Sequence, residues 1–202
     1  MRYIPPVPLP SRPTDDWSTR HSVLTTARRT AALINALADD GARPSDIADV
    51  LRAYGETDPV DLTPHDVATM RTAAAQLRQV FTAEHTDDAA ATLNGLLRDH
   101  TGPLRLTSHG GTAPWHPHLD RADDAPWAEW LLASSCMALT VLTWDHQRPP
   151  GRTCASPACR NVFITQGSGQ ERRYCSRRCA TRERVAAHRR ARAAERPGSA
   201  HE

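Results

Sequence analysis

Four of the five cysteines lie close together near the end of the chain, in the pattern Cys154-x4-Cys159-x15-Cys175-x3-Cys179. Zinc prefers about four soft ligands in a tetrahedron, and two closely spaced pairs let a turn and a helix end supply two thiolates each. We therefore predict that these four cysteines bind one structural Zn²⁺. Four protein sulfurs leave no open position for water or substrate, so we do not expect this ion to be catalytic. A redox dithiol and disulfides are the alternatives.

The residues around the cysteines predict a small module built on that ion. Ser156-Pro157 supplies a first turn, residues 161–165 are strand-like, residues 166–169 reverse the chain, and residues 172–174 return as the second strand. A helix is expected to begin at Cys175 and to place Cys179 in its first turn. This order of turn, hairpin and helix predicts a treble-clef-like zinc finger. The module has few large apolar residues, so the metal would supply on the order of 10 kcal/mol of its folding free energy.

Charge is distributed unevenly along the chain. Residues 1–148 carry 13 Arg and 19 Asp or Glu, a balance of −6, whereas residues 149–202 carry 12 Arg and 4 Glu, a balance of +8. There is no lysine, so the positive charge consists of guanidinium groups, which suit bidentate contacts with phosphate. A biased genomic base composition is the alternative explanation for the missing lysines.

Most arginines after Cys175 share one face of the expected helix. At 100° per residue, seven of them fall within an arc of about 160°, and Arg190 lies outside it. We predict that this face and the two arginines before Cys175 contact the phosphate backbone of a nucleic acid. The alternatives are a solvated basic face, or a face that docks on the acidic N-terminal part. The predicted nucleic-acid-binding residues are Arg172, Arg173, Arg177, Arg178, Arg182, Arg189 and Arg192.

The N-terminal part carries the apolar spacing of amphipathic helices. Four are expected before residue 100, and a fifth, the most apolar, includes Cys136 as a small buried hydrophobe. The first helix is expected to run from near Asp16 to Asp40-Gly41, and the second from its N-cap Ser45 to Gly55. The third is expected to begin at the capping box formed by Thr63-Pro64 and Asp66, and the fourth at its N-cap Thr86. The fifth is expected to run from Pro126 to about Gln147.

A short hairpin is expected at residues 103–118, PLRLTSHGGTAPWHPH, with its turn at Gly110-Gly111. Strand alternation puts His116 and His118 on the same face, with His109 nearby. These histidines and Trp115 form the candidate ligand site of the N-terminal part, for a second metal, an anionic ligand or acid–base chemistry. The alternative is that the imidazoles form hydrogen bonds between helices and hairpin. The tryptophans are expected in core and interface packing: Trp17, Trp115, Trp127, Trp130 and Trp144.

These patterns predict a mainly α protein: a helical bundle with a small hairpin, followed by the zinc finger. The longest apolar stretch, residues 130–144, is shorter than the roughly 20 residues that span a bilayer, so no membrane partner is expected. Prolines occupy the N-terminus where a secretion signal would be apolar, which favours the cytoplasm. We find no nucleophile–base pattern, Walker loop or Rossmann glycine pattern, so we do not expect an enzyme.

The finger resembles the CGNR zinc-finger proteins. The resemblance rests on Cys154-x4-Cys159 with Val162-Phe163, and on the stretches RRYCS, CATR and VAAHRRAR that begin at Arg172, Cys179 and Val185. Upstream, Leu93-Asn94 and the histidine-containing hairpin are similar to features of the same family. The resemblance implies an N-terminal helical ABATE domain that senses a ligand or dimerises, and a stress-induced transcription regulator that binds DNA. The expected divisions are a Pro-rich segment at 1–16, the ABATE-like domain at 17–147, the finger at 148–196 and a flexible tail at 197–202.

The sequence departs from the family at two places. The naming motif Cys-Gly-Asn-Arg reads Cys179-Ala180-Thr181-Arg182, and the hairpin tip reads TQGSG at residues 165–169, where many members carry Asp, Ser, Arg and Asn. Two other functions therefore stay open: a zinc-braced adaptor for protein or RNA, and a small-molecule or enzymatic role at His109, His116 and His118. The expected partners are DNA, a small-molecule effector and a second copy of the chain.

Overall fold

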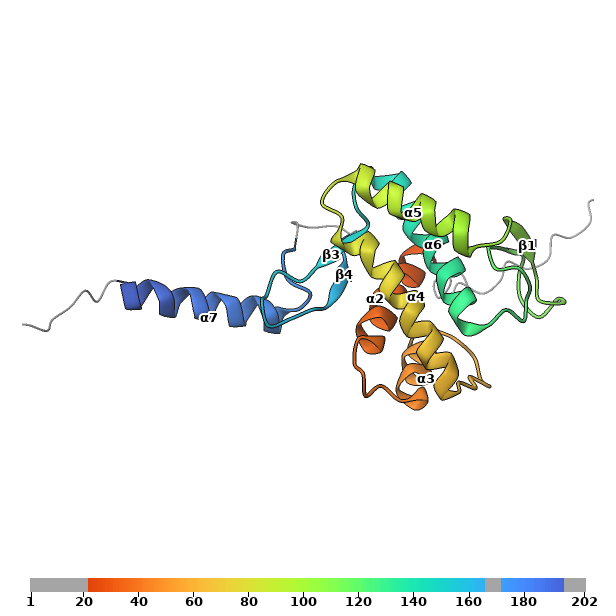
Figure 1. The fold of residues 1–202 in the computed structure, drawn as a ribbon, viewed down its shortest axis with the longest axis horizontal. Helices are drawn as coiled ribbons and strands as arrows, with labels where there is room; N and C mark the ends of the chain where they lie inside the picture. Colours follow the sequence, from red (N-terminus) through yellow and green to blue (C-terminus); the bar gives the residue numbers. More distant parts are fainter. Residues whose placement is uncertain (1–21, 166–171, 195–202) are drawn as a thin grey trace, which may run out of the picture.

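The computed structural model describes residues 22–165 and 172–194 of the chain. The predictions for residues 1–16, the hairpin tip at 166–169, the tail at 197–202 and Trp17 lie outside them, as does Arg196, the last of the seven arginines in the predicted arc. Within the described ranges the fold is mainly α, as predicted, with two small antiparallel sheets (Figure 1). No described helix is long and apolar enough to cross a membrane.

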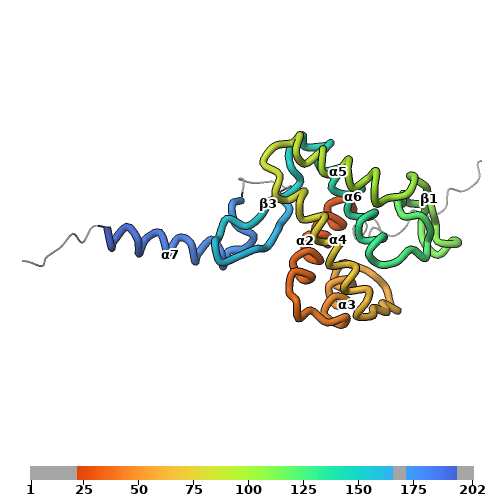
Figure 2. The backbone as a smooth tube through the Cα atoms, viewed as in Figure 1, coloured from red at the N-terminus to blue at the C-terminus, as the bar shows by residue number. Residues whose placement is uncertain are grey.

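The bundle is arranged around α6 (Trp127–His146), which contacts α2 (Val23–Leu37), α4 (Pro64–Thr82) and α5 (Thr86–His100). Residues on several sides of α6 are buried because three helices surround it, and its composition is accordingly apolar around most of its circumference. The short α3 (Pro44–Ala53) packs against α2 and α4. The tube in Figure 2 follows the chain through these helices.

Local sequence signals set most helix ends. The predicted capping box of α4 is confirmed: the backbone N–H of Asp66 donates to Thr63 Oγ1 at 3.1 Å, and that of Thr63 donates to Asp66 Oδ2 at 2.8 Å. The predicted N-cap of α3 is wrong, since the helix begins at Pro44 and Arg43 is the N-cap. Proline fits the first helical position, where its missing N–H is not needed, and this signal outweighs Ser45. The N-cap of α5 is His85, one residue before the prediction.

The predicted hairpin is confirmed as β1 (Arg105–Thr107) paired antiparallel with β2 (His116–His118). Gly110 and Gly111 have φ values of 67° and 90°, which glycine adopts without a steric penalty. Two of the tryptophans that were expected in core and interface packing do not lie in the core: Trp115 is 72% exposed and Trp144 is 74% exposed.

The second sheet differs from the prediction. β3 (Gly151–Thr153) pairs with β4 (Val162–Ile164), and the turn with the first two cysteines lies between them. The expected partner, residues 172–174, forms no strand, although the Arg173 carbonyl accepts a hydrogen bond from Ala155 N–H at 2.9 Å. β3 is a polar tripeptide directly after two prolines, so neither apolar alternation nor strand propensity indicated it.

The second sheet also joins the core of the bundle. Val162 and Ile164 belong to the same buried cluster as the helix residues. Asn35 of α2 donates its amide N–H to the Val162 carbonyl at 2.9 Å and accepts from the Val162 N–H at 2.8 Å. The hairpin of the finger is thus fixed to the helices by both apolar contacts and hydrogen bonds.

The last helix, α7 (Arg177–Ala194), extends away from the bundle (Figure 1). Among the described residues it makes no contact with another helix or strand. Within the described residues, the arginine face of α7 therefore does not dock on the acidic helical part, which was the alternative expectation.

Candidate metal centre and arginine face

The four predicted cysteine ligands converge. Their sulfur atoms all lie within 4.8 Å of one another, with Cys175 Sγ at 3.7 Å from Cys159 Sγ and at 3.8 Å from Cys179 Sγ. Zinc–sulfur bonds of about 2.3 Å in a tetrahedron place the sulfurs about 3.8 Å apart. The four cysteines can therefore hold a zinc ion, and a full set of protein sulfurs gives it a structural role.

Short-range backbone geometry positions each pair. In the first pair, the Cys159 N–H donates to the Ser156 carbonyl at 2.8 Å, which closes the turn after Cys154. In the second pair, the Ser176 hydroxyl accepts from the Cys179 N–H at 3.2 Å, which is N-cap geometry. α7 therefore begins at Arg177, two residues later than predicted, and Cys179 still lies in its first turn. The Cys175 N–H also donates to Cys154 Sγ at 3.4 Å, which links the pairs.

The thiols have unequal acidities. Burial, together with the neighbouring thiols, raises the pKa of Cys175 to about 12. The hydrogen bond with the Ser176 hydroxyl lowers the pKa of Cys179 to about 7. Four adjacent sulfurs cannot all ionise without a compensating positive charge, and a divalent ion that favours thiolate ligands supplies that charge.

A polar network braces the metal centre from the side of α7. Arg182 donates through Nη2 to Ser156 Oγ at 2.7 Å and to Cys179 Sγ at 3.5 Å. Ser156 is buried and donates to Glu183 Oε1 at 2.5 Å. Arg182, predicted to contact nucleic acid, thus also contacts a ligand sulfur, and Ser156 and Glu183 are site residues that the sequence did not indicate.

The other predicted arginines are exposed on the finger. Arg172 donates to the Ile164 carbonyl at 3.3 Å and its guanidinium lies 5.7 Å from the centre of the Phe163 ring. Arg173 lies 5.9 Å from the ring centre of Tyr174. The arginines that α7 exposes are Arg177, Arg178, Arg182, Arg184, Arg189, Arg190 and Arg192.

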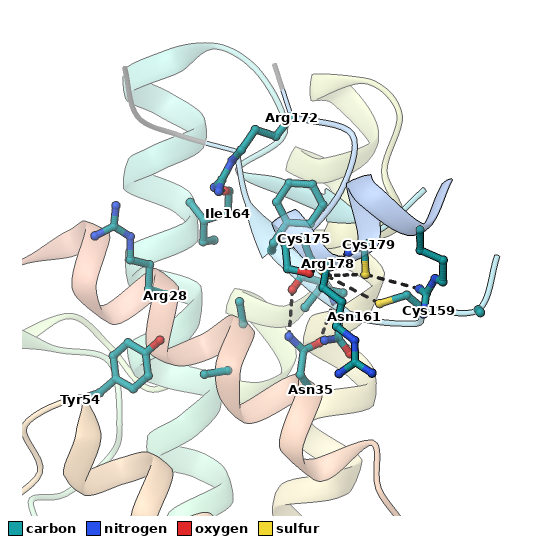
Figure 3. Close-up of a pocket in the computed structure, with 17 residues that line it drawn as sticks. Arg28, Asn35, Tyr54, Cys159, Asn161, Ile164, Arg172, Cys175, Arg178 and Cys179 are labelled. Atoms are coloured by element: carbon teal, nitrogen blue, oxygen red, sulfur yellow. Dashed lines mark hydrogen bonds between the residues drawn. The ribbon is translucent and has the colours of Figure 1, made fainter. Parts of the chain in front are cut away.

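A hollow of about 660 Å³ lies between α2 and the finger (Figure 3). Among its lining residues, all from the described ranges, are four arginines and no Asp or Glu. Arg172, Arg178 and Arg182 come from the finger, and Arg28 comes from α2. The sequence did not indicate Arg28 as a residue of this surface, because the apolar pattern of a helix does not show that the exposed side of α2 lies beside the finger.

The candidate ligand site in the helical part is also assembled. The ligand nitrogens of His109, His116 and His118 lie within 4.8 Å of one another, and Trp115 lines the same cavity. The expectation that His116 and His118 share a face is confirmed by the 2.9 Å between their Nε2 atoms. Asp120, which lies 2.8 Å from His118 Nδ1, was missed because it follows the strand rather than lying in it.

In a comparison with known families, residues 151–192 of the chain match the CGNR zinc finger. The match covers all four cysteines and most of α7. No curated protein matches the chain.

Proposed function

We propose that the protein is a DNA-binding transcription regulator, in which the zinc ion holds α7 in place and α7 contacts the phosphate backbone. The observation that carries this proposal is the array of exposed arginines on a helix that extends away from the acidic part of the chain. Within the described residues, Arg178, Arg189 and Arg192 form no ion pair, so their charge is available to a partner. Guanidinium groups form bidentate hydrogen bonds with phosphate.

The hollow beside the finger extends this basic surface toward the bundle. Arg28 and Arg178 line it from α2 and α7, and no carboxylate lines it to neutralise them. A phosphate backbone that follows α7 could therefore continue across the hollow and contact the helical part. In this proposal Arg28 and Tyr54, which also lines the hollow, join the predicted nucleic-acid-binding residues.

The helical part has a regulatory role in this proposal rather than an enzymatic one. It would bind a small effector or a second copy of the chain and alter how the finger is presented. The shared core between β4 and the helices supports such a coupling, since a change in the packing of α2 reaches Val162 directly.

The test is the salt dependence of binding to random-sequence duplex DNA, measured by fluorescence anisotropy with the full chain. Each neutralised phosphate contributes about 0.9 to the slope of log K against log salt. Arg178→Ala and Arg189→Ala are each expected to lower affinity and to reduce that slope by about 1.

Arg190→Ala is the matched control, because it removes the same charge from the same helix at a position outside the arginine arc. It is expected to change the slope less than the other two variants. Binding that is flat across salt concentrations would contradict the proposal, as would equal effects of all three variants. A protein or RNA partner retained in the presence of excess duplex DNA would instead support the adaptor function.

A further inference from the structure

We propose that His109, His116 and His118 bind a second metal ion, a divalent transition metal, at a site that is open to a cavity in the helical part. This inference goes beyond the proposed function and does not depend on DNA binding.

The three rings aim the same atom at a common point. His116 Nε2 lies 2.9 Å from His118 Nε2 and 3.2 Å from His109 Nε2. Zinc–nitrogen bonds of about 2.0–2.1 Å at tetrahedral angles place two nitrogens about 3.3 Å apart. The three imidazoles therefore already have nearly the spacing that one ion requires.

The opposite nitrogens determine which form of each ring is present. His118 Nδ1 lies 2.8 Å from Asp120 Oδ2, and His116 Nδ1 lies 2.7 Å from the Pro114 carbonyl. A carboxylate and a carbonyl only accept hydrogen bonds, so both rings carry their proton on Nδ1. In the neutral ring Nε2 then presents a lone pair. Two lone pairs at this distance repel each other unless a cation or a shared proton lies between them.

This pattern of outer contacts is the one that metal-binding histidines use. A carboxylate or carbonyl on the far nitrogen fixes the ring and makes the near nitrogen a better ligand. Asp120 is buried, and it also accepts from Arg105 Nη2 at 2.6 Å, so its own position is held. His109 Nδ1 lies 3.5 Å from Asp123 Oδ2, and the same carboxylate oxygen accepts a hydrogen bond from the Thr107 hydroxyl at 2.8 Å.

The backbone of His109 is also consistent with a binding role. Its φ of 49° lies in the left-handed region, which costs a non-glycine residue roughly 1 kcal/mol or more. The next two residues are glycines, which would adopt such a conformation freely. The histidine at position 109 places an imidazole beside His116, whereas a glycine at the same position would provide no ligand.

The three histidines line a cavity of about 620 Å³. Its other walls include Trp127 and Trp130, and the buried Arg29, which pairs with Glu56 and lies 4.2 Å above the Trp130 ring. Three protein ligands leave a fourth position of a tetrahedral ion for water or a small ligand, whereas four close it. The ion would thus accept a small oxygen or nitrogen donor from the cavity, in contrast to the closed cysteine site.

The experiment uses the purified, reduced full chain, equilibrated with excess zinc and desalted, with zinc per chain measured by mass spectrometry. The wild type is expected to retain one zinc ion more than His116→Ala or His109→Gly. His109→Gly is expected to keep its fold, because glycine accepts the positive φ without strain. His65→Ala, at an exposed position of α4, is the control and should match the wild type.

Circular dichroism of the same samples shows whether each variant keeps its helices. Equal zinc content in the wild type and a folded His109→Gly variant would overturn the proposal. A proton shared between the rings would then explain the short distances between their Nε2 atoms.

Cobalt substitution tests whether the ion in the histidine site has a coordination position that a small ligand can occupy. Cobalt in the histidine site is expected to give ligand-field bands that shift when azide is added, while the sulfur-to-cobalt charge-transfer bands of the finger stay unchanged. Histidine-site bands that do not respond to azide would overturn the open coordination position.

Discussion

Arg182 links the metal centre to the arginine face of α7, because its guanidinium contacts both the turn of the finger and a ligand sulfur. The hydrogen bonds from Nη2 to Ser156 Oγ and to Cys179 Sγ orient the thiolate that α7 supplies. Outer contacts of this kind tune a metal site as well as hold it. Of the four residues that name the CGNR zinc finger, which residues 151–192 match, this chain has Cys179 and Arg182, and the contact between them gives a structural reason for an arginine at this position.

We expect Arg182→Ala to weaken zinc binding about 10- to 100-fold, because Cys179 loses a charged hydrogen-bond donor. The measurement is competition for zinc between the protein and a coloured chelator. Arg189→Ala, which removes an exposed arginine two turns further along α7, should lower DNA affinity and leave zinc affinity unchanged. Equal zinc affinities for the two variants would contradict a role of the Arg182–Cys179 contact in holding the metal.

Cys136 provides a separate prediction about pH. Burial in α6 raises the pKa of this thiol from 9.0 to about 12, so the folded state keeps it neutral while the unfolded state ionises it. The unfolded state then binds fewer protons, and the free energy of unfolding should fall by about 1.4 kcal/mol per pH unit above pH 9, until the folded pKa is reached.

Urea denaturation at pH 8 and pH 10 measures this effect, with Cys136→Ala as the comparison. The variant loses some stability at both pH values because it leaves a small cavity, but the additional loss between them should be smaller than in the wild type. The same loss in both proteins would contradict a buried, neutral thiol.

At the scale of elements, the short strand β3 holds the finger against the bundle. A Cβ at Gly151 would lie 2.5 Å from the Phe163 carbonyl oxygen and 2.5 Å from Phe81 Cε1, and Phe81 is buried. The absence of a side chain at Gly151 therefore lets β3 lie directly on α4.

We expect Gly151→Ala to lower the free energy of unfolding by about 1–3 kcal/mol, as overpacking does. Gly95→Ala is the matched control with the opposite sign, since its Cβ meets nothing closer than 4.0 Å and alanine favours the helix by about 0.5–1 kcal/mol. Thermal unfolding of both variants checks the pair. A Gly151→Ala protein as stable as the wild type would show that β3 can move away from Phe81.

The elements differ in how far the sequence could predict them. Thr63 and Asp66 define the start of α4 through contacts within four residues, so a local pattern was enough. The prediction of β4 was correct, but its partner was wrong, because pairing depends on Val162 entering a core formed by distant helices. Apolar periodicity does not contain that information.

At the scale of the whole molecule, the division of charge along the sequence corresponds to a division in space. The basic helix α7 lies apart from the acidic helical part, whereas β4 is integrated in its core. The four cysteines were predictable because their spacing alone limits the geometry. The approach of Arg28 to the finger and the contact of Asp120 with His118 were not, because each depends on how separate segments pack.

The central claim is that a zinc ion bound by four thiolates organises the finger that presents α7. The most direct test is mass-spectrometric mapping of cysteine alkylation in the reduced full chain, before and after a zinc chelator is added. We predict that all five cysteines resist alkylation with zinc bound, and that chelation exposes Cys154, Cys159, Cys175 and Cys179 together while the buried Cys136 stays protected. Rapid alkylation of the four finger cysteines before chelation, in protein that retains its zinc, would contradict the account.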